Sequence, residues 1–117
     1  MMKLRKIYST WMPPKGYKAI TLIFWVVIRK DARFTDVDYN HENIHLAQEM
    51  ELLFIGFYLW YGIEYLIRLM MYRSHNDAYR NISFEQEAYM YQYDMEYLDT
   101  RSHFTWLRYL TKKTFRR

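Results

Sequence analysis

Two of the four histidines in this 117-residue chain stand four positions apart, in the pattern His41-Glu42-x-x-His45. Residues four apart on an α-helix point in the same direction, so both imidazole rings can offer a nitrogen to one metal ion. Glu42 is turned about 100° around the helix from His41, so it can lie beside the ion without binding it. The pattern therefore predicts a hydrolytic zinc site in which Glu42 is the general base for a zinc-bound water.

A catalytic zinc ion needs a third protein ligand and one open coordination position. The chain has no cysteine, so this ligand must be a histidine or a carboxylate. Position 51, which carries the last histidine of the extended HExxHxxGxxH motif, is glutamate here. We therefore expect a carboxylate from another helix to complete the site. The candidates are Glu85 and Glu87, at the start of a later helix, and, as rivals, Glu51, Glu64 and Glu96.

The helix that carries the motif should begin close to it. Residues 31–40 contain several Asp and Asn residues that can cap a helix, so we expect one to begin near Val37–His41. Helical character then continues with few breaks to about Tyr72. Before the helix, residues 19–28 are rich in β-branched and aromatic side chains and too few to span a bilayer, so we expect a strand there.

The later helix begins with a capping signal. Ser83-Phe84-Glu85-Gln86 fits a capping box, with serine at the cap and glutamine three residues later. This predicts a helix from Phe84 to about Asp99, preceded by a polar loop over residues 74–82. A short last helix is expected over Phe104–Thr111.

The two motifs together resemble a known family. His41-Glu42-Asn43-Ile44-His45 followed by Phe84-Glu85-Gln86-Glu87-Ala88 resembles the gluzincin branch of the zincin metallopeptidases, in which a glutamate on a later helix completes the zinc site. The second segment is similar to the E-x-x-A-D element of the CAAX prenyl proteases. The chain also resembles the very small zincins called minigluzincins and bacterial proteins of similar length. The resemblance implies that His41, His45 and Glu85 bind zinc and that Glu42 is the base.

One position departs from the family pattern. The aspartate that follows the alanine, and that orients the first histidine, is Tyr89 here. The partner that fixes the orientation of His41 is therefore open, and Asp94 or a backbone carbonyl are candidates. Gln48 and Glu49 continue the faces of the two histidines and either contact them or form an ordinary polar face.

The composition agrees with a small helical zincin. With 51% hydrophobic and 21% aromatic residues the chain can build a compact core, and three Gly and two Pro leave few positions for turns. We expect a mainly α fold with a small β element, of the α+β class, as one minimal zincin-like domain over residues 1–117. In this fold the motif helix packs against the later helix that carries the glutamate ligand.

Charge gives weaker indications. The net charge is +4, and basic residues cluster at residues 3–6 and 112–117, which favours solvated ends over a nucleic-acid or anionic-lipid patch. Zinc-finger spacing, an RNP-like strand and a basic base-reading helix are all missing from the sequence, so we expect no nucleic-acid partner.

Residues 52–71 raise the question of a membrane. They carry only Glu64 and Arg68 as charges, four positions apart in the order that favours an ion pair within a helix. The length would reach across a bilayer core, but the charges lie in its second half, so we favour a buried or interfacial helix over a transmembrane span. The N-terminal residues reach Trp11-Met12-Pro13-Pro14 before any apolar run, so we expect no signal peptide. We expect a cytoplasmic protein, with membrane association through residues 52–71 as the alternative.

We therefore expect a zinc-dependent metallopeptidase that acts on a peptide or protein substrate. The alternative is a non-catalytic zinc-binding helical protein that acts as an interaction or membrane-surface module. Residues 19–28 have a second interpretation as well, since zincins hold extended substrate against an edge strand. A chain of this length has little room for a cleft with two walls, so a homo-oligomer is a further expectation.

Overall fold

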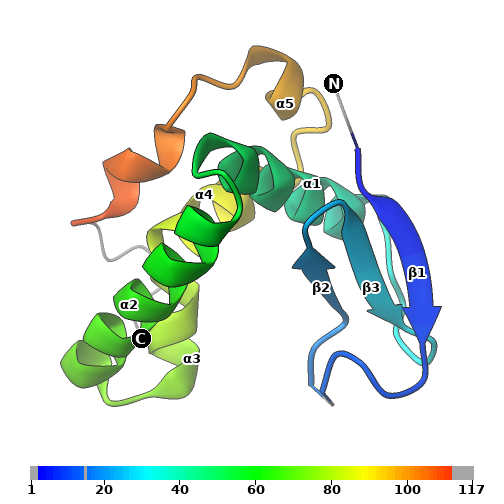
Figure 1. Ribbon diagram of the computed structural model, residues 1–117, viewed down its shortest axis with the longest axis horizontal. Coiled ribbons are helices and arrows are strands. Elements are labelled where there is room, and N and C mark those ends of the chain that lie inside the picture. Colours follow the sequence, from blue (N-terminus) through cyan, green and yellow to red (C-terminus); the bar gives the residue numbers. More distant parts are fainter. Residues whose placement is uncertain (1–2, 15, 112–117) are drawn as a thin grey trace.

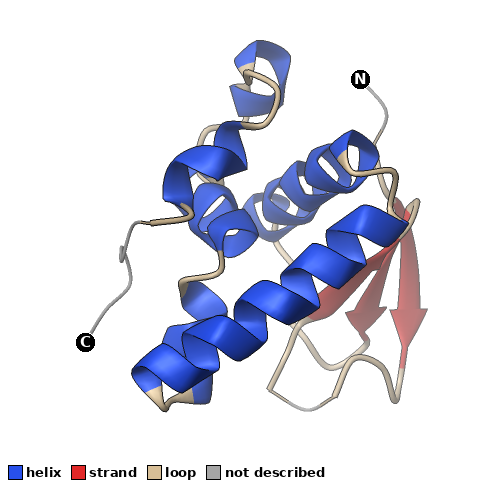
Figure 2. Ribbon diagram, turned by 60° about the vertical axis from the view of Figure 1, so that its left-hand side comes forward, coloured by secondary structure: helices blue, strands red, loops and turns tan. Residues whose placement is uncertain are grey.

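The computed structural model describes residues 3–14 and 16–111, and it places the motif helix between a small sheet and the remaining helices (Figure 1). Figure 2 shows the strands gathered on one side of the molecule and the helices on the other. Helices make up 54% of the described residues, and the sheet has three strands. The expected mainly α fold of the α+β class is confirmed.

The sheet contains three short strands, β1 (Arg5–Ser9), β2 (Ala19–Leu22) and β3 (Trp25–Arg29). The prediction of one strand over residues 19–28 is wrong, because the backbone turns at Ile23, where φ is 55°. The turn lacks the Asn-Gly type of sequence that usually marks a hairpin. The first strand, β1, was not predicted from the sequence.

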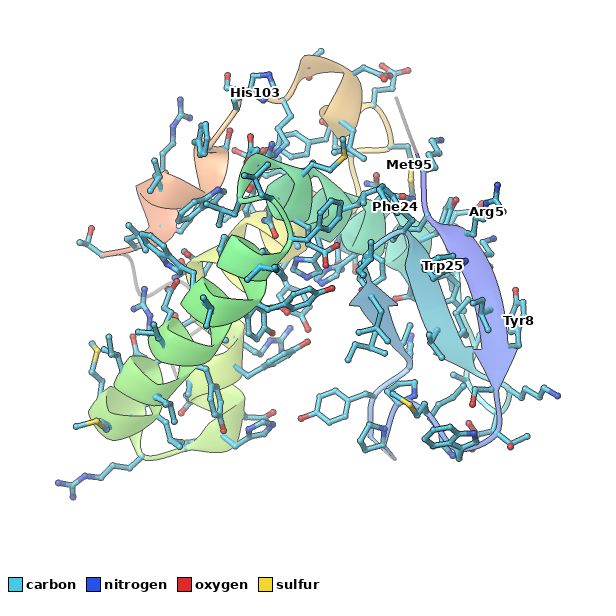
Figure 3. All side chains as sticks on the ribbon, viewed as in Figure 1. Arg5, Tyr8, Phe24, Trp25, Met95 and His103 are labelled. Carbon is cyan, nitrogen blue, oxygen red and sulfur yellow. The ribbon has the colours of Figure 1, made fainter. Side chains whose placement is uncertain are left out.

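The strand order is β1-β3-β2, with β1 parallel and β2 antiparallel to β3. β1 and β2 are therefore the two edge strands. On β1, Arg5 and Tyr8 point away from the helices (Figure 3), and Tyr8 is 56% exposed. β2 lies beside the motif helix, so its edge is the one that can take part in a site.

α1 (Asp36–Glu51) carries the motif and begins one residue before the range expected from sequence. Its start has a capping box: the Asp38 N–H donates to Thr35 Oγ1 at 3.2 Å, and the Thr35 N–H donates to Asp38 Oδ2 at 2.9 Å. Further along, the Asn43 side chain accepts a hydrogen bond from the Leu4 N–H at 2.8 Å. The motif helix is thus fixed to the start of the sheet.

Helical character does not continue unbroken beyond α1. Leu53 and Phe54 both have positive φ, 55° and 63°, and α2 (Ile55–Tyr72) runs at 110° to α1. The bend contains no Gly or Pro, so the sequence gives no signal of it. Its consequence is that α2 turns back over the motif, where the Phe57 ring lies 6.2 Å from the His45 ring.

α3 (His75–Arg80) occupies most of the stretch expected as a polar loop, and α4 (Ser83–Tyr91) follows it. The prediction of a capping box at Ser83 is wrong. The Ser83 hydroxyl and the Ser83 N–H instead donate to the Glu64 carboxylate, at 2.6 and 2.7 Å. Glu64 is buried and also accepts from Arg68 at 3.1 Å. The ion pair predicted between Glu64 and Arg68 is confirmed.

α4 ends at Tyr91 rather than near Asp99. The Asn40 side-chain amide of α1 donates to the carbonyls of Gln92 and Asp94, at 2.8 and 3.0 Å, and so stabilises a turn in place of further helix. Two short elements follow: α5 (Tyr97–Thr100) and the 3₁₀ helix η1 (Thr105–Tyr109), which replaces the helix expected over Phe104–Thr111.

α2 is less buried than expected, since only Phe57, Glu64 and Arg68 of its residues are buried. Within the part of the chain that the structure describes, no single helix has both the length and the apolarity of a membrane span. The bent pair of α1 and α2 together does have the length and the apolarity of a membrane span. The prediction of a buried helix over residues 52–71 is wrong, and the interfacial helix stays a prediction.

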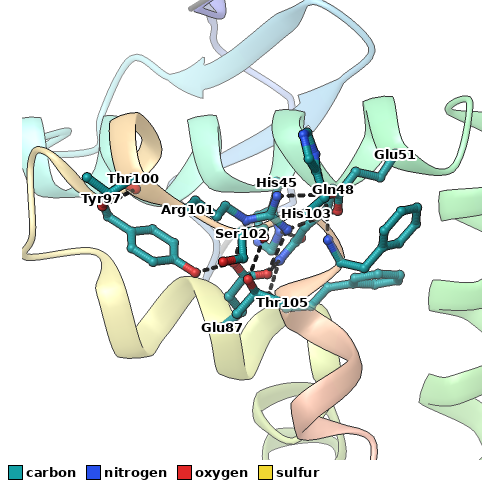
Figure 4. Close-up of polar contacts among 12 residues, drawn as sticks. His45, Gln48, Glu51, Glu87, Tyr97, Thr100, Arg101, Ser102, His103 and Thr105 are labelled. Carbon is teal, nitrogen blue, oxygen red and sulfur yellow. Dashed lines mark hydrogen bonds and ion pairs between the residues drawn. The ribbon is translucent and has the colours of Figure 1, made fainter.

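A buried network of charged groups connects the segment after α5 to α1 and α4 (Figure 4). Arg101 donates to Glu51 of α1 at 2.9 Å and to Glu87 of α4 at 2.5 Å. The Tyr97 hydroxyl also donates to Glu87, at 2.6 Å. The three charged side chains are at most 6% exposed, so each charge is stabilised by its ion-pair partner rather than by water.

Replacing Arg101 with Met should destabilise the protein strongly, because it leaves two carboxylates buried without a cation. The loss of one partner in such a network costs about 3–5 kcal/mol. Chemical denaturation should show a loss of this size, whereas Arg108→Met, at an exposed arginine of η1, should change stability by less than about 0.5 kcal/mol. Equal stability of the two variants would contradict the role given to Arg101.

Candidate metal centre

The packing of α4 on α1 brings three ligand atoms to one point. His41, His45 and Glu85 each offer one atom, and these atoms lie within 4.8 Å of one another. The Nε2 atoms of His41 and His45 lie 3.2 and 3.1 Å from the same Glu85 oxygen, Oε1. All three side chains are buried. The structure thus brings together the three residues predicted as the ligand set.

The tautomer of His45 is fixed by Gln48. Nδ1 of His45 lies 2.7 Å from Gln48 Oε1. The amide nitrogen of Gln48 donates to the Phe84 carbonyl and to the Glu87 carboxylate, both at 3.0 Å. Because both of these groups are acceptors, the amide cannot be turned the other way, and its oxygen must accept from the histidine. His45 therefore carries a proton on Nδ1 and directs Nε2 at Glu85.

His41 has an equivalent partner in Gln92, whose Oε1 lies 2.8 Å from Nδ1. Gln92 thus fills the role left open by Tyr89, whose ring packs against His41 with 4.6 Å between centroids. Asp94, proposed for this role, uses its carboxylate to accept from the Glu96 N–H. Gln92 was missed, although its position seven residues after Glu85 places both on one helical face.

The two glutamines leave three hydrogen-bond acceptors facing one another. When both imidazoles are neutral with the proton on Nδ1, each presents a lone pair at Nε2, and Glu85 presents Oε1. The other oxygen of Glu85 accepts from the Tyr61 hydroxyl at 2.7 Å. Buried acceptors without a donor are costly, so the arrangement needs a cation at its centre. Two imidazoles and one carboxylate fit a catalytic metal site.

In the protein alone, a proton takes the place of that cation. Burial acts to lower the pKa of His45, but the Glu85 carboxylate outweighs burial and raises this pKa to about 10. Burial acts to raise the pKa of Glu85, but His45 and His41 hold it well below its usual range. A histidine binds metal in its neutral form, so metal binding near pH 7 should release this proton.

Glu42 lies beside the cluster, at the wall of an open cavity. This cavity has a volume of about 480 Å³, and Glu42, His45 and Glu85 all line it. The hydroxyl of Thr21, on β2, donates to Glu42 at 2.6 Å. A second cavity of about 570 Å³ adjoins the first and is lined by Glu42 and His41. The cluster therefore borders two cavities, and Glu42 lines both of them.

Aromatic side chains form much of the wall of the first cavity. Tyr79 of α3 lines both cavities, and burial together with the Glu85 carboxylate raises its pKa well above the usual value. Its hydroxyl therefore stays protonated. At one end, His75 hydrogen-bonds with the hydroxyls of Tyr17 and Tyr65, at 2.5 and 2.9 Å. His75 thus joins the two sides of the cavity and lies apart from the ligand group.

The other carboxylates considered as ligands lie elsewhere. Glu87 is fully buried, and its carboxylate bonds to Arg101. Glu51 shares the same arginine, and Glu64 pairs with its own arginine on α2. Glu96 is exposed. Of the five carboxylates weighed from sequence, Glu85 belongs to the group that could hold a metal ion.

We compared the chain with known families, curated proteins and solved structures. No family model, curated protein or solved structure matches the chain. The resemblance to gluzincins therefore rests on the two motifs, and the metal site rests on the geometry of the His-His-Glu group.

Each of the substitutions His41→Ala, His45→Ala and Glu85→Ala should abolish stoichiometric metal binding, because two ligands cannot hold the ion in a protein of this kind. Metal content per chain, measured by mass spectrometry after gel filtration, should be close to one for the wild type. His75→Ala and His103→Ala remove histidines outside the group and should keep the metal. Retention of metal by Glu85→Ala would exclude it as the third ligand.

In chelator, the free energy of unfolding should fall as pH rises from about 7.5 to 9.5. The pKa of His45 is raised from 6.5 to about 10, so its stabilising contribution is complete below 6.5 and is lost as pH rises toward 10. Glu49, whose pKa burial raises to about 7, changes charge mainly below this range. Denaturation curves recorded across the range measure the slope.

Two controls isolate the contribution of this pair. Glu85→Gln removes the carboxylate that raises the pKa of His45, so its stability should vary less with pH over the same range. Saturating zinc should also reduce the slope, because the ion replaces the proton. Identical slopes in wild type and Glu85→Gln would show that another group causes the dependence.

Proposed function

We propose that the protein is a zinc-dependent metallopeptidase. The observation that carries the proposal is the convergence of His41, His45 and Glu85 on one point at the wall of a cavity that Glu42 also lines. Zinc is favoured because imidazole and carboxylate ligands without a thiolate are typical of its catalytic sites.

The surroundings of the cluster favour catalysis over a structural role for the metal. Structural zinc sites are closed by four protein ligands, whereas catalytic sites keep a position open. Among the residues that the structure describes, the group has three members, and two cavities border it. The fourth coordination position would thus be accessible to water or substrate.

The cavity also offers a place for an extended peptide. β2 is an edge strand, and its Ala19, Ile20 and Thr21 line the cavity together with Tyr58 and Tyr61 of α2. A peptide can add to such an edge through main-chain hydrogen bonds, with its side chains directed into pockets. β2 and α2 supply two walls from one chain, which supports a peptide substrate without requiring a second copy.

The residues around the cluster have separate tasks. When bound, a zinc ion acidifies water and polarises a carbonyl oxygen. Glu42 accepts the proton of the attacking water and passes it to the leaving amine. Thr21 orients the Glu42 carboxylate through its 2.6 Å hydrogen bond. Tyr79, which stays protonated at the border of both cavities, donates to the negative oxygen of the tetrahedral adduct.

Glu42→Gln should retain zinc and lose hydrolysis, because glutamine keeps the shape of the side chain but cannot accept the proton. The expected reduction in rate is about 10²- to 10⁴-fold. Mass spectrometry of a mixed peptide library, incubated with wild type, Glu42→Gln and wild type in chelator, measures the difference. His103→Ala, at an exposed histidine away from the cluster, should cleave as the wild type does.

The same assay separates the two functions considered. Peptide cleavage by wild type that both chelator and Glu42→Gln abolish supports the metallopeptidase. If wild type and Glu42→Gln hold equal zinc and neither cleaves any member of the library, catalysis is excluded for these substrates. The non-catalytic zinc-binding protein would then be the better account.

A further inference from the structure

α2 presents its polar groups to the protein and its apolar groups to the outside. Its two charged residues, Glu64 and Arg68, are buried and paired. The hydroxyls of Tyr58, Tyr61 and Tyr65 hydrogen-bond with side chains of α1, α4 and α3. A helix of this kind has its polar side fixed to its own protein, and its other side remains for a partner.

The outward side of α2 is a continuous apolar surface. This α2 face consists of Ile55, Leu59, Ile63, Leu66, Ile67 and Met70. Their exposed fractions range from 54% to 79%, and they recur every three or four residues over the length of the helix. Exposed apolar surfaces of this extent without an interspersed charge mark sites of protein or membrane interaction.

Exposed basic residues stand at the end of α2 and on η1, a neighbouring element. Arg73 follows α2 directly and is exposed, and Arg108 is exposed on η1. η1 is held against α2 because Arg68 donates to the Leu110 carbonyl at 2.6 Å. The acidic residue of α2 itself is turned inward.

We infer that the α2 face binds an anionic membrane surface, with α2 lying in the plane of the interface. Interfacial helices bind in this way when apolar side chains enter the acyl boundary and basic residues meet anionic headgroups. A second copy of the chain suits the surface less well, because its own α2 face offers no acidic side chain to the exposed arginines. The inference does not depend on metal binding or on peptidase activity.

Cosedimentation with vesicles tests this inference. The full chain should bind vesicles of phosphatidylcholine and phosphatidylglycerol, and bind vesicles of phosphatidylcholine alone about tenfold or more weakly. Ile63→Glu with Met70→Glu should reduce binding to the anionic vesicles about tenfold or more. The matched control, Tyr93→Glu with Met95→Glu, makes the same charge change at exposed residues outside α2 and should bind as the wild type does.

A second pair of substitutions keeps the apolar face intact. Arg73→Gln with Arg108→Gln should weaken binding to anionic vesicles about fivefold per residue and leave the fold unchanged, since both side chains are exposed. The inference is overturned if the wild type fails to bind anionic vesicles, or if the α2 pair and its control lose binding equally. It is also overturned if the wild type is a dimer that Ile63→Glu with Met70→Glu dissociates and no vesicle binds.

Discussion

The structure depends on three hydrogen-bond acceptors that meet at the buried contact between α1 and α4. Two imidazole nitrogens and one carboxylate oxygen are stable this close together when a proton or a metal ion lies between them. His41 and His45 each hydrogen-bond through Nδ1 with a glutamine oxygen, Gln92 and Gln48, so both Nε2 atoms are directed at Glu85. These three atoms form a donor set suited to a catalytic metal ion. The proposed function is peptide hydrolysis at that ion, with Glu42 as the base.

The support for this site extends well beyond its ligands. The orientation of His45 depends on Gln48, the amide of Gln48 is fixed partly by Glu87, and Glu87 is compensated by Arg101. A residue far along the chain thus bears on the tautomer of a metal ligand. The bend between α1 and α2 has a similar effect, because it lets Tyr61 bind one oxygen of Glu85 and leave the other for a cation. The buried polar side chains of this small protein form one connected system.

The sequence predicts the parts of this structure that depend on local pattern. Residues close together in the chain decide the metal-binding motif, the cap at the start of α1 and the Glu64–Arg68 pair. The overall composition is enough to predict the α+β class. The parts that it does not predict are decided by contacts between distant segments. Asn40 ends α4 by binding carbonyls after it, and Glu64 takes the Ser83 hydroxyl that would otherwise cap the helix. The turn at Ile23 and the bend at Leu53 use none of the residues that usually mark such positions.

The claim that His41, His45 and Glu85 form the metal centre is tested most directly by X-ray absorption at the zinc edge of the zinc-loaded protein. The account predicts a first shell of two imidazole nitrogens and oxygen ligands at about 2.0–2.2 Å, and the same two imidazoles in His75→Ala and His103→Ala. A first shell of oxygen alone, or imidazole scattering that falls in His75→Ala or His103→Ala, would contradict it.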